Sequence, residues 1–166
     1  MNGDELRERQ APLKDRYRLE PEAAVITLQA DGSLADSDVV CSVQTGRALV
    51  EAGLHPATGG DGTFACSGDM LLQALVACAG VTLRSVATSR GIAVTGTVRA
   101  EGDLDFRGTL GVDRSAPVGF RSIRLSFHLE SDANAETLDS LVATTERYCV
   151  VLQTLAQTPE LSVVYD

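Results

Sequence analysis

The feature that most constrains this chain is an apolar run between Ser67 and Gly91. Ser67 is a favourable residue for starting a helix, and Gly91 suits the left-handed position that ends one. Between Met70 and Val81 apolar side chains cover every side of the expected helix, interrupted by Gln73 alone. A helix that is apolar all round is normally buried. The run therefore predicts a buried helix around which the rest of the fold is built.

Composition and charge limit the classes of function that are open to the chain. The chain has 166 residues and a formal net charge of −9, with no basic run, so binding to nucleic acid or to an anionic membrane surface is disfavoured. The apolar run is interrupted by Ser, Thr and Arg, and a membrane span needs about 18 or more largely apolar residues. The N-terminal residues form no apolar signal segment, so we expect a cytoplasmic protein that makes no use of a membrane.

The remaining periodicity predicts an α+β fold with a polar N-terminal extension, residues 1–22, and a single domain, residues 23–166. The extension is expected to hold a short helix over Asp4–Gln10. The glycine-containing segment 102–119 reads as a long loop, and a loop of that length is more often functional than filler. Alternating patterns predict strands over residues 24–30, 39–43, 94–101, 120–130 and 161–165, and less clearly over 47–54, with a hairpin turn at Asp31-Gly32 and a second helix after Asn134.

Two of the four cysteines, Cys78 and Cys149, fall on core-facing positions of the two predicted helices. Free cysteine commonly packs as a small buried hydrophobe, which is the simplest reading of both. A reactive thiol instead requires a nearby cation or helix N-terminus, since burial alone disfavours the thiolate. Metal binding is not expected, because the two histidines, His55 and His128, and the cysteines show no metal-ligand spacing.

Two segments resemble motifs of the OsmC/Ohr family, the osmotically inducible protein C and organic hydroperoxide resistance proteins. The run Leu71-Leu72-Gln73-Ala74-Leu75-Val76-Ala77-Cys78 is similar to the central-helix motif, and Glu146–Leu155 is similar to the second-cysteine motif. The resemblance implies an α+β fold with antiparallel sheets wrapped around a long buried central helix. It also implies an intertwined homodimer that reduces organic hydroperoxides at two interface sites and needs no cofactor.

The same resemblance assigns roles to the thiols. Cys78 corresponds to the peroxidatic cysteine, which becomes a sulfenic acid, and Cys149 to the resolving cysteine, which condenses with it to a disulfide. An external dithiol would then reduce that disulfide. An apolar pocket around the thiols would favour alkyl or lipid hydroperoxides over hydrogen peroxide.

The chain departs from the family pattern at the groups that activate the thiolate. The expected arginine is missing from the segment 31–36, and the expected glutamate falls at about Gly68, next to Asp69. Candidate replacements are Arg107 and Arg114 in the long loop and, after them, Arg47, although each is individually more typical of a solvated surface residue. Asp69 and the loop residue His55 are candidate pocket residues.

These departures leave a second hypothesis open. The chain would then be a non-catalytic dimer that binds a small apolar ligand, with its thiols structural or redox-sensing.

Overall fold

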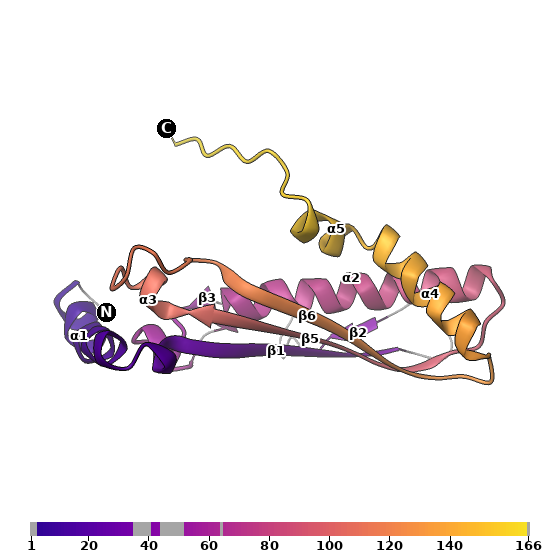
Figure 1. Cartoon of the computed structure of the whole chain (residues 1–166), viewed down its shortest axis with the longest axis horizontal. Helices are drawn as coiled ribbons and strands as arrows, with labels where there is room; N and C mark the ends of the chain where they lie inside the picture. Colours follow the sequence, from indigo (N-terminus) through magenta and orange to yellow (C-terminus); the bar gives the residue numbers. More distant parts are fainter. Residues whose placement is uncertain (1–2, 35–40, 44–51, 64, 166) are drawn as a thin grey trace.

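A computed structural model describes residues 3–34, 41–43, 52–63 and 65–165 of the chain. It has an α+β fold in which a four-stranded antiparallel sheet, in the order β2-β1-β5-β6, carries the long helix α2 along one face (Figure 1). A parallel pair, β3-β4, lies beside it. The helices are α1 (Gly3–Leu19), α2 (Ser67–Ser89), α3 (Phe106–Thr109), α4 (Ala135–Tyr148) and α5 (Val150–Ala156), with 3-10 turns η1 (Pro21–Ala24) and η2 (Pro56–Thr58). The strands are β1 (Val25–Leu34), β2 (Cys41–Val43), β3 (Ala52–Gly53), β4 (Ala65–Cys66), β5 (Thr95–Asp105) and β6 (Phe120–Glu130).

Helix α2 has 23 residues and begins and ends close to its predicted limits, although its N-cap is Cys66 and not Ser67. Gly91 takes the left-handed conformation, with φ of 64°, as the sequence predicts. The helix face toward the sheet is fully buried at Leu72, Leu75, Val76, Ala79, Leu83 and Ala87.

The opposite face of α2 remains open in the single chain. Met70 is 36%, Leu71 37% and Val81 42% exposed. The prediction of a helix buried on every side is therefore only partly correct. The sheet covers one side of α2, and α4 and α5 leave part of the other side exposed in the single chain. Helix α2 is long and apolar enough to cross a membrane by length and composition alone, and one side of it is buried within the domain.

Strand β1 is longer than its pattern predicts. Asp31 pairs with Arg99 and Gly32 with Val98, so these residues continue the strand. The prediction of a hairpin turn at Asp31-Gly32 is therefore wrong. Pairing with β5 satisfies their backbone groups, which overrides the local turn preference of the dipeptide. The connection from β1 to β2 falls in residues 35–40, outside the described part of the chain.

Strand β5 also extends beyond its predicted end, through Gly102 to Asp105. Gly102 lies on the buried face of β5, where the absence of a side chain leaves room for the Phe120 ring. A Cβ at this position would lie 2.4 Å from Cε1 of Phe120. The predicted long loop therefore shrinks to residues 110–119, preceded by the short helix α3.

Strand β6 forms where predicted, with half-buried Ile123, Leu125, Phe127 and Leu129 alternating with exposed polar residues. It is an edge strand and carries one irregularity. Asp103 pairs with Ser122 but Leu104 pairs with Phe120, so Arg121 is an extra residue with no partner in β5. This β-bulge turns the Arg121 side chain out of the regular alternation.

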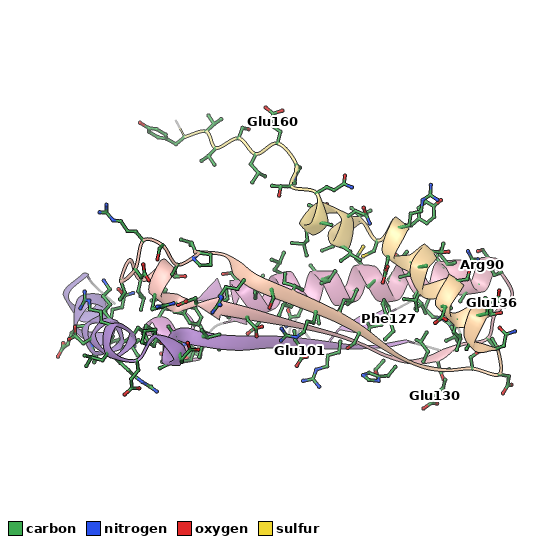
Figure 2. The ribbon with its side chains drawn as sticks, in the orientation of Figure 1. Arg90, Glu101, Phe127, Glu130, Glu136 and Glu160 are labelled. Atoms are coloured by element: carbon green, nitrogen blue, oxygen red, sulfur yellow. The ribbon has the colours of Figure 1, made fainter. Side chains whose placement is uncertain are left out.

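Helix α4 begins at the predicted cap, where the Asn134 side chain accepts a hydrogen bond from the Thr137 backbone N–H at 2.9 Å. Its buried side, which includes Leu141 and Thr145, lies against α2 (Figure 1). Residues 157–165 then leave the body of the domain as an extended tail, on which Figure 2 places Glu160.

The tail does not form the strand predicted over 161–165. A strand needs a neighbour to satisfy its backbone groups, and this segment finds none in the described part of the single chain. Its apolar side chains, at Leu161, Val163, Val164 and Tyr165, are between 78% and 97% exposed.

The N-terminal extension forms a helix of 17 residues, longer than the one predicted over Asp4–Gln10. It packs against the domain and does not simply project from it. Tyr17 is 2% exposed and its hydroxyl donates to the Ala57 carbonyl at 2.8 Å, while Gln10 Nε2 donates to the Thr58 carbonyl at 3.1 Å. Of the strand expected over 47–54, residues 52–54 lie in the described part of the chain, and Ala52–Gly53 form β3.

Candidate functional site

The candidate site is built on two thiols that α2 and the α4–α5 junction bring together. Cys78 lies near the middle of α2 and is half-buried, whereas Cys149 is 0% exposed. The two side chains lie near enough for Cys78 to raise the pKa of Cys149, and both are free thiols. We refer to Cys78 and Cys149 as the thiol pair.

The backbone around Cys149 fixes this arrangement. Its N–H closes α4 by donating to the Thr145 carbonyl at 2.8 Å, and its carbonyl opens α5 by accepting from the Gln153 N–H at 2.9 Å. Cys149 has extended backbone angles, φ −72° and ψ 104°, so the chain bends between the two helices. This bend directs the sulfur toward α2.

The two thiols differ in electrostatic environment. Burial, with a smaller effect of the neighbouring Cys78, raises the pKa of Cys149 to about 11, while the Leu152 and Val151 backbone amides at the start of α5 act in the opposite direction. Cys149 is therefore a protonated thiol at neutral pH. Of the described groups that act on it, none is an arginine.

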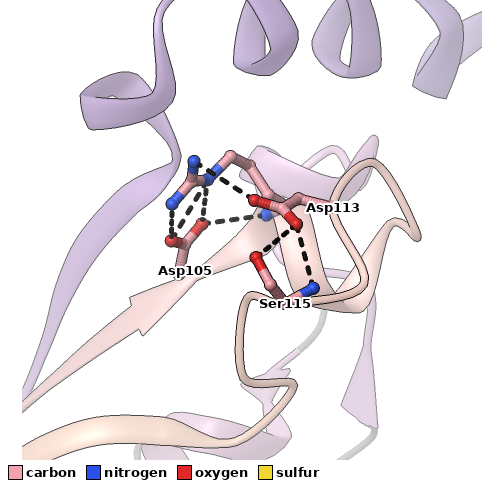
Figure 3. A network of polar contacts seen from close by, with 4 residues as sticks. Asp105, Asp113 and Ser115 are labelled. Atoms are coloured by element: carbon pink, nitrogen blue, oxygen red, sulfur yellow. Dashed lines mark hydrogen bonds and ion pairs between the residues drawn. The ribbon is translucent and has the colours of Figure 1, made fainter.

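Arg107, one predicted thiolate-stabilising residue, is held in a separate polar network (Figure 3). Its Nη2 lies 2.6 Å from Asp105 Oδ2 and its Nη1 lies 3.6 Å from Asp113 Oδ2. The Arg107 guanidinium lowers the pKa of Asp105, whose side chain is 1% exposed. Arg107 thus fixes the turn after β5 and does not meet the thiol pair in the described chain.

The other two candidate arginines do not join the thiol pair either. Arg114 is an exposed residue of the 110–119 loop, for which no contact with the pair is described. Arg47 lies outside the described residues.

An apolar groove of about 530 Å³ lies between α2, β6 and α5. Leu152 and Leu155, on the helix that Cys149 opens, form one wall, and Leu71, seven residues before Cys78, forms another. The groove is lined by Leu71, Gly119, Phe120, Arg121, Ser122, Ile123, Leu125, Leu152, Leu155 and Ala156. A cavity of this size and character suits a small, largely apolar ligand.

A second cavity, of about 410 Å³, adjoins the groove and shares Leu71, Gly119 and Phe120 with it. His55 lines this cavity together with Cys66, and we call it the His55 cavity. The His55 ring stacks on Phe106 with centroids 5.1 Å apart.

Of the two predicted pocket residues, His55 lines this cavity, whereas Asp69 is not among its lining residues but lies close enough for His55 to affect its pKa. His55 Nδ1 accepts a hydrogen bond from the Ala57 N–H at 3.0 Å, which leaves Nε2 as the protonated nitrogen of the neutral ring. Burial raises the pKa of Asp69, and the charge of His55 partly opposes this rise. Within the described ranges no three His, Cys, Asp or Glu side chains group as a metal site would require.

Comparison with known proteins places this arrangement in a family. The family model of the OsmC-like protein matches residues 60–164, which is more than half of the chain and includes both thiols. The chain belongs to the OsmC-like family. This outcome confirms the resemblance seen in the sequence motifs.

A solved structure supports the OsmC-like fold. An OsmC-like hydroperoxide resistance protein from Jannaschia sp. CCS1 superposes with a TM-score of 0.55 at 15% identity, covering 83% of this chain and 91% of that one. At that identity the likeness concerns the fold and not the activity. No curated protein matches the chain.

Sequence reasoning missed two residues that line these cavities. Arg121 sits on the β-bulge of β6, which alternation alone does not reveal, and Cys66 lines the His55 cavity at the start of α2. The sequence signal available for Arg121 is the pair Phe120-Arg121 before the regular alternation begins at Ser122.

Proposed function

We propose that this OsmC-like protein is a thiol-dependent peroxidase that reduces organic hydroperoxides through Cys78 and Cys149. The observation that carries the proposal is the proximity of the two side chains, which lie 71 residues apart in the sequence (149 − 78) and are near enough for Cys78 to raise the pKa of Cys149. Two thiols that lie side by side can form a disulfide, and half-buried Cys78 is the more accessible of the two.

The reaction follows the thiol oxidation sequence. The Cys78 thiolate attacks one oxygen of the O–O bond, the bond breaks, and the organic alcohol leaves after taking up a proton. Cys78 is then a sulfenic acid, oxidised by two electrons. The Cys149 sulfur attacks the Cys78 sulfur, its proton joins the departing hydroxide to give water, and a disulfide forms. An external dithiol restores both thiols by exchange.

The raised pKa of Cys149 fits the second of these roles better than the first. A thiol with a pKa of about 11 is almost entirely protonated at neutral pH and is a poor attacking group for a peroxide. Once Cys78 is a sulfenic acid next to it, proximity and orientation replace intrinsic reactivity.

We also propose that the functional unit is a homodimer. In the single chain, Met70 and Val81 of α2 and the apolar side chains of the tail are exposed to solvent. Contiguous exposed apolar surface on a folded domain normally marks an interface. A second copy packed on the open face of α2 would cover it, and would place the groove and the thiol pair beside the interface.

One observation favours the non-catalytic alternative, a dimer that binds a small apolar ligand. Among the described groups that affect the pKa of Cys149 there is no arginine, while the apolar groove is large enough to hold a ligand without any chemistry. In that case the thiols are packing or redox-sensing groups.

A turnover assay distinguishes the two proposed functions. We expect purified protein, supplied with a dithiol, to consume an alkyl hydroperoxide, and Cys78→Ser to abolish consumption. Cys66→Ser is the matched control, since Cys66 is a free, half-buried thiol outside the pair, and it should retain activity. Equal turnover by the Cys78→Ser and wild-type proteins would eliminate the peroxidase and leave the binding protein.

A further inference from the structure

Arg121 is the one charged side chain among the described residues that line the apolar groove. Among the other lining residues only Ser122 has a polar side chain, and none has a carboxylate. Arg121 is an exposed residue at the rim of the groove, where the β-bulge makes it an extra residue on the edge strand β6. Bulges of this kind redirect side chains next to binding sites.

Neighbouring acidic groups leave Arg121 available. Asp103, which shares a small surface cavity with Arg121, already receives Arg124 Nη1 at 2.6 Å and the Ser122 hydroxyl at 2.7 Å. Asp105 is held by Arg107 and feels the charge of Arg121 only weakly. Across the described part of the chain, Arg121 forms no ion pair of its own, in contrast to Arg107 and Arg124.

The apolar part of the groove has a defined course. Leu71 comes from α2, Ile123 and Leu125 from β6, and Leu152 and Leu155 from α5, so three elements present aliphatic side chains to the same space. An apolar molecule in this space would leave water on all three elements, which favours binding in proportion to the area buried. A cation beside such a surface selects a molecule that ends in an anion.

We propose that the groove binds an amphipathic molecule with an unbranched apolar chain and an anionic head, and that Arg121 holds the head. The guanidinium donates two hydrogen bonds to a carboxylate-like head while the chain lies against Ile123, Leu152 and Leu155. The inference rests on the proposed function only in naming the substrate class that the groove selects. Arg121 is then a specificity residue, since it acts on the head and not on the reacting bond.

The test is calorimetric titration of the full chain with decanoate and with decan-1-ol, which share a chain length and differ in charge. We expect wild-type protein to bind decanoate at least about tenfold more tightly than decan-1-ol, a difference of about 1.4 kcal/mol. Arg121→Gln should weaken decanoate about tenfold and leave decan-1-ol unchanged. Arg90→Gln is the matched control, because Arg90 binds Ser140 and Thr144 at the other end of α2 and should not alter either affinity (Figure 2).

A second variant tests the apolar wall. Leu155→Asp should weaken decanoate and decan-1-ol together. Equal affinity of wild type for the two probes, unchanged decanoate affinity in Arg121→Gln, or absence of decanoate binding to the wild type would each overturn the proposal. Decanoate has no O–O bond, so these outcomes are independent of peroxide turnover: loss of turnover with intact decanoate binding counts against the peroxidase alone.

Discussion

The Cys78 thiol on α2 lies near the Cys149 thiol at the junction of α4 and α5, close enough to raise the pKa of Cys149. This proximity depends on three features of the chain. Leu72, Leu75 and Leu83 hold α2 on the sheet, Leu141 and Thr145 hold α4 against α2, and the bend at Cys149 directs its sulfur inward. The thiol pair is thus a product of core packing, and substitutions that loosen that packing should also loosen the pair.

The first prediction concerns the alkaline side of stability. Burial raises the pKa of Cys149 to about 11, above the value of about 8.5 for an unfolded cysteine. The folded state therefore keeps the proton that the unfolded state loses, and the stabilisation is fully present below about pH 8.5 and is lost as pH rises toward about 11. Urea unfolding across this range should show the wild type losing stability more steeply than Cys149→Ala. Parallel curves for the two proteins would contradict the assignment.

The second prediction concerns the acidic side and the network of Figure 3. The Arg107 guanidinium lowers the pKa of Asp105, so this pair stabilises the fold above the unfolded value of about 3.9 and its contribution disappears as pH falls through the lower folded value. Asp105→Asn should lower the free energy of unfolding near neutral pH, and its difference from wild type should shrink in acid. The exposed Asp139→Asn is the control, and a similar acid dependence there would count against the network.

The third prediction tests the close approach at β5. A methyl group at Gly102 would lie 2.4 Å from Cε1 of Phe120, whereas Gly119 has no heavy atom within 4 Å of the corresponding position. Gly102→Ala should destabilise the protein by about 1–3 kcal/mol because the ring must move. Gly119→Ala should change the free energy of unfolding by less than about 0.5 kcal/mol. Thermal unfolding of both variants provides the comparison, and equal effects would refute the contact.

The fourth prediction tests the proposed dimer. Val81 is 42% exposed on the open face of α2, so Val81→Glu would place a charge in the interface and should raise the dimer dissociation constant at least about tenfold. Analytical ultracentrifugation measures this constant directly. Leu19→Glu, at the exposed end of α1, introduces the same charge away from α2 and should leave it unchanged. A wild-type protein that sediments as a monomer would contradict the dimer itself.

The sequence predicts the elements whose signals are local. Gly91 ends α2 and Asn134 starts α4 because both act through their own backbone or side chain, and the alternation of β6 reflects burial of one face. The turn at Asp31-Gly32 and the loop from Gly102 were predicted wrongly because pairing with a distant strand decides both. The tail 161–165 has no such partner in the part of the chain that the structure describes, and it forms no strand there.

The residues of the candidate site also differ in how well the sequence predicts them. Cys78 and Cys149 were found because two motifs carry them, and their proximity follows from the packing of α4 and α5 on α2. Arg121 was missed because a bulge depends on the register between two strands, which a single sequence does not encode in its alternation. Arg107 was expected at the thiols, but its sequence neighbour Asp105 and the nearby Asp113 hold it instead.

The most direct test of the redox pair is to map cysteine oxidation after one equivalent of an alkyl hydroperoxide, by mass spectrometry of the digested protein. We expect a Cys78–Cys149 disulfide as the main product in wild type, and Cys78 sulfinic acid in Cys149→Ser, where nothing resolves the sulfenic acid. A wild-type protein that forms no Cys78–Cys149 disulfide, or that oxidises Cys66 while both members of the pair stay reduced, would contradict the account.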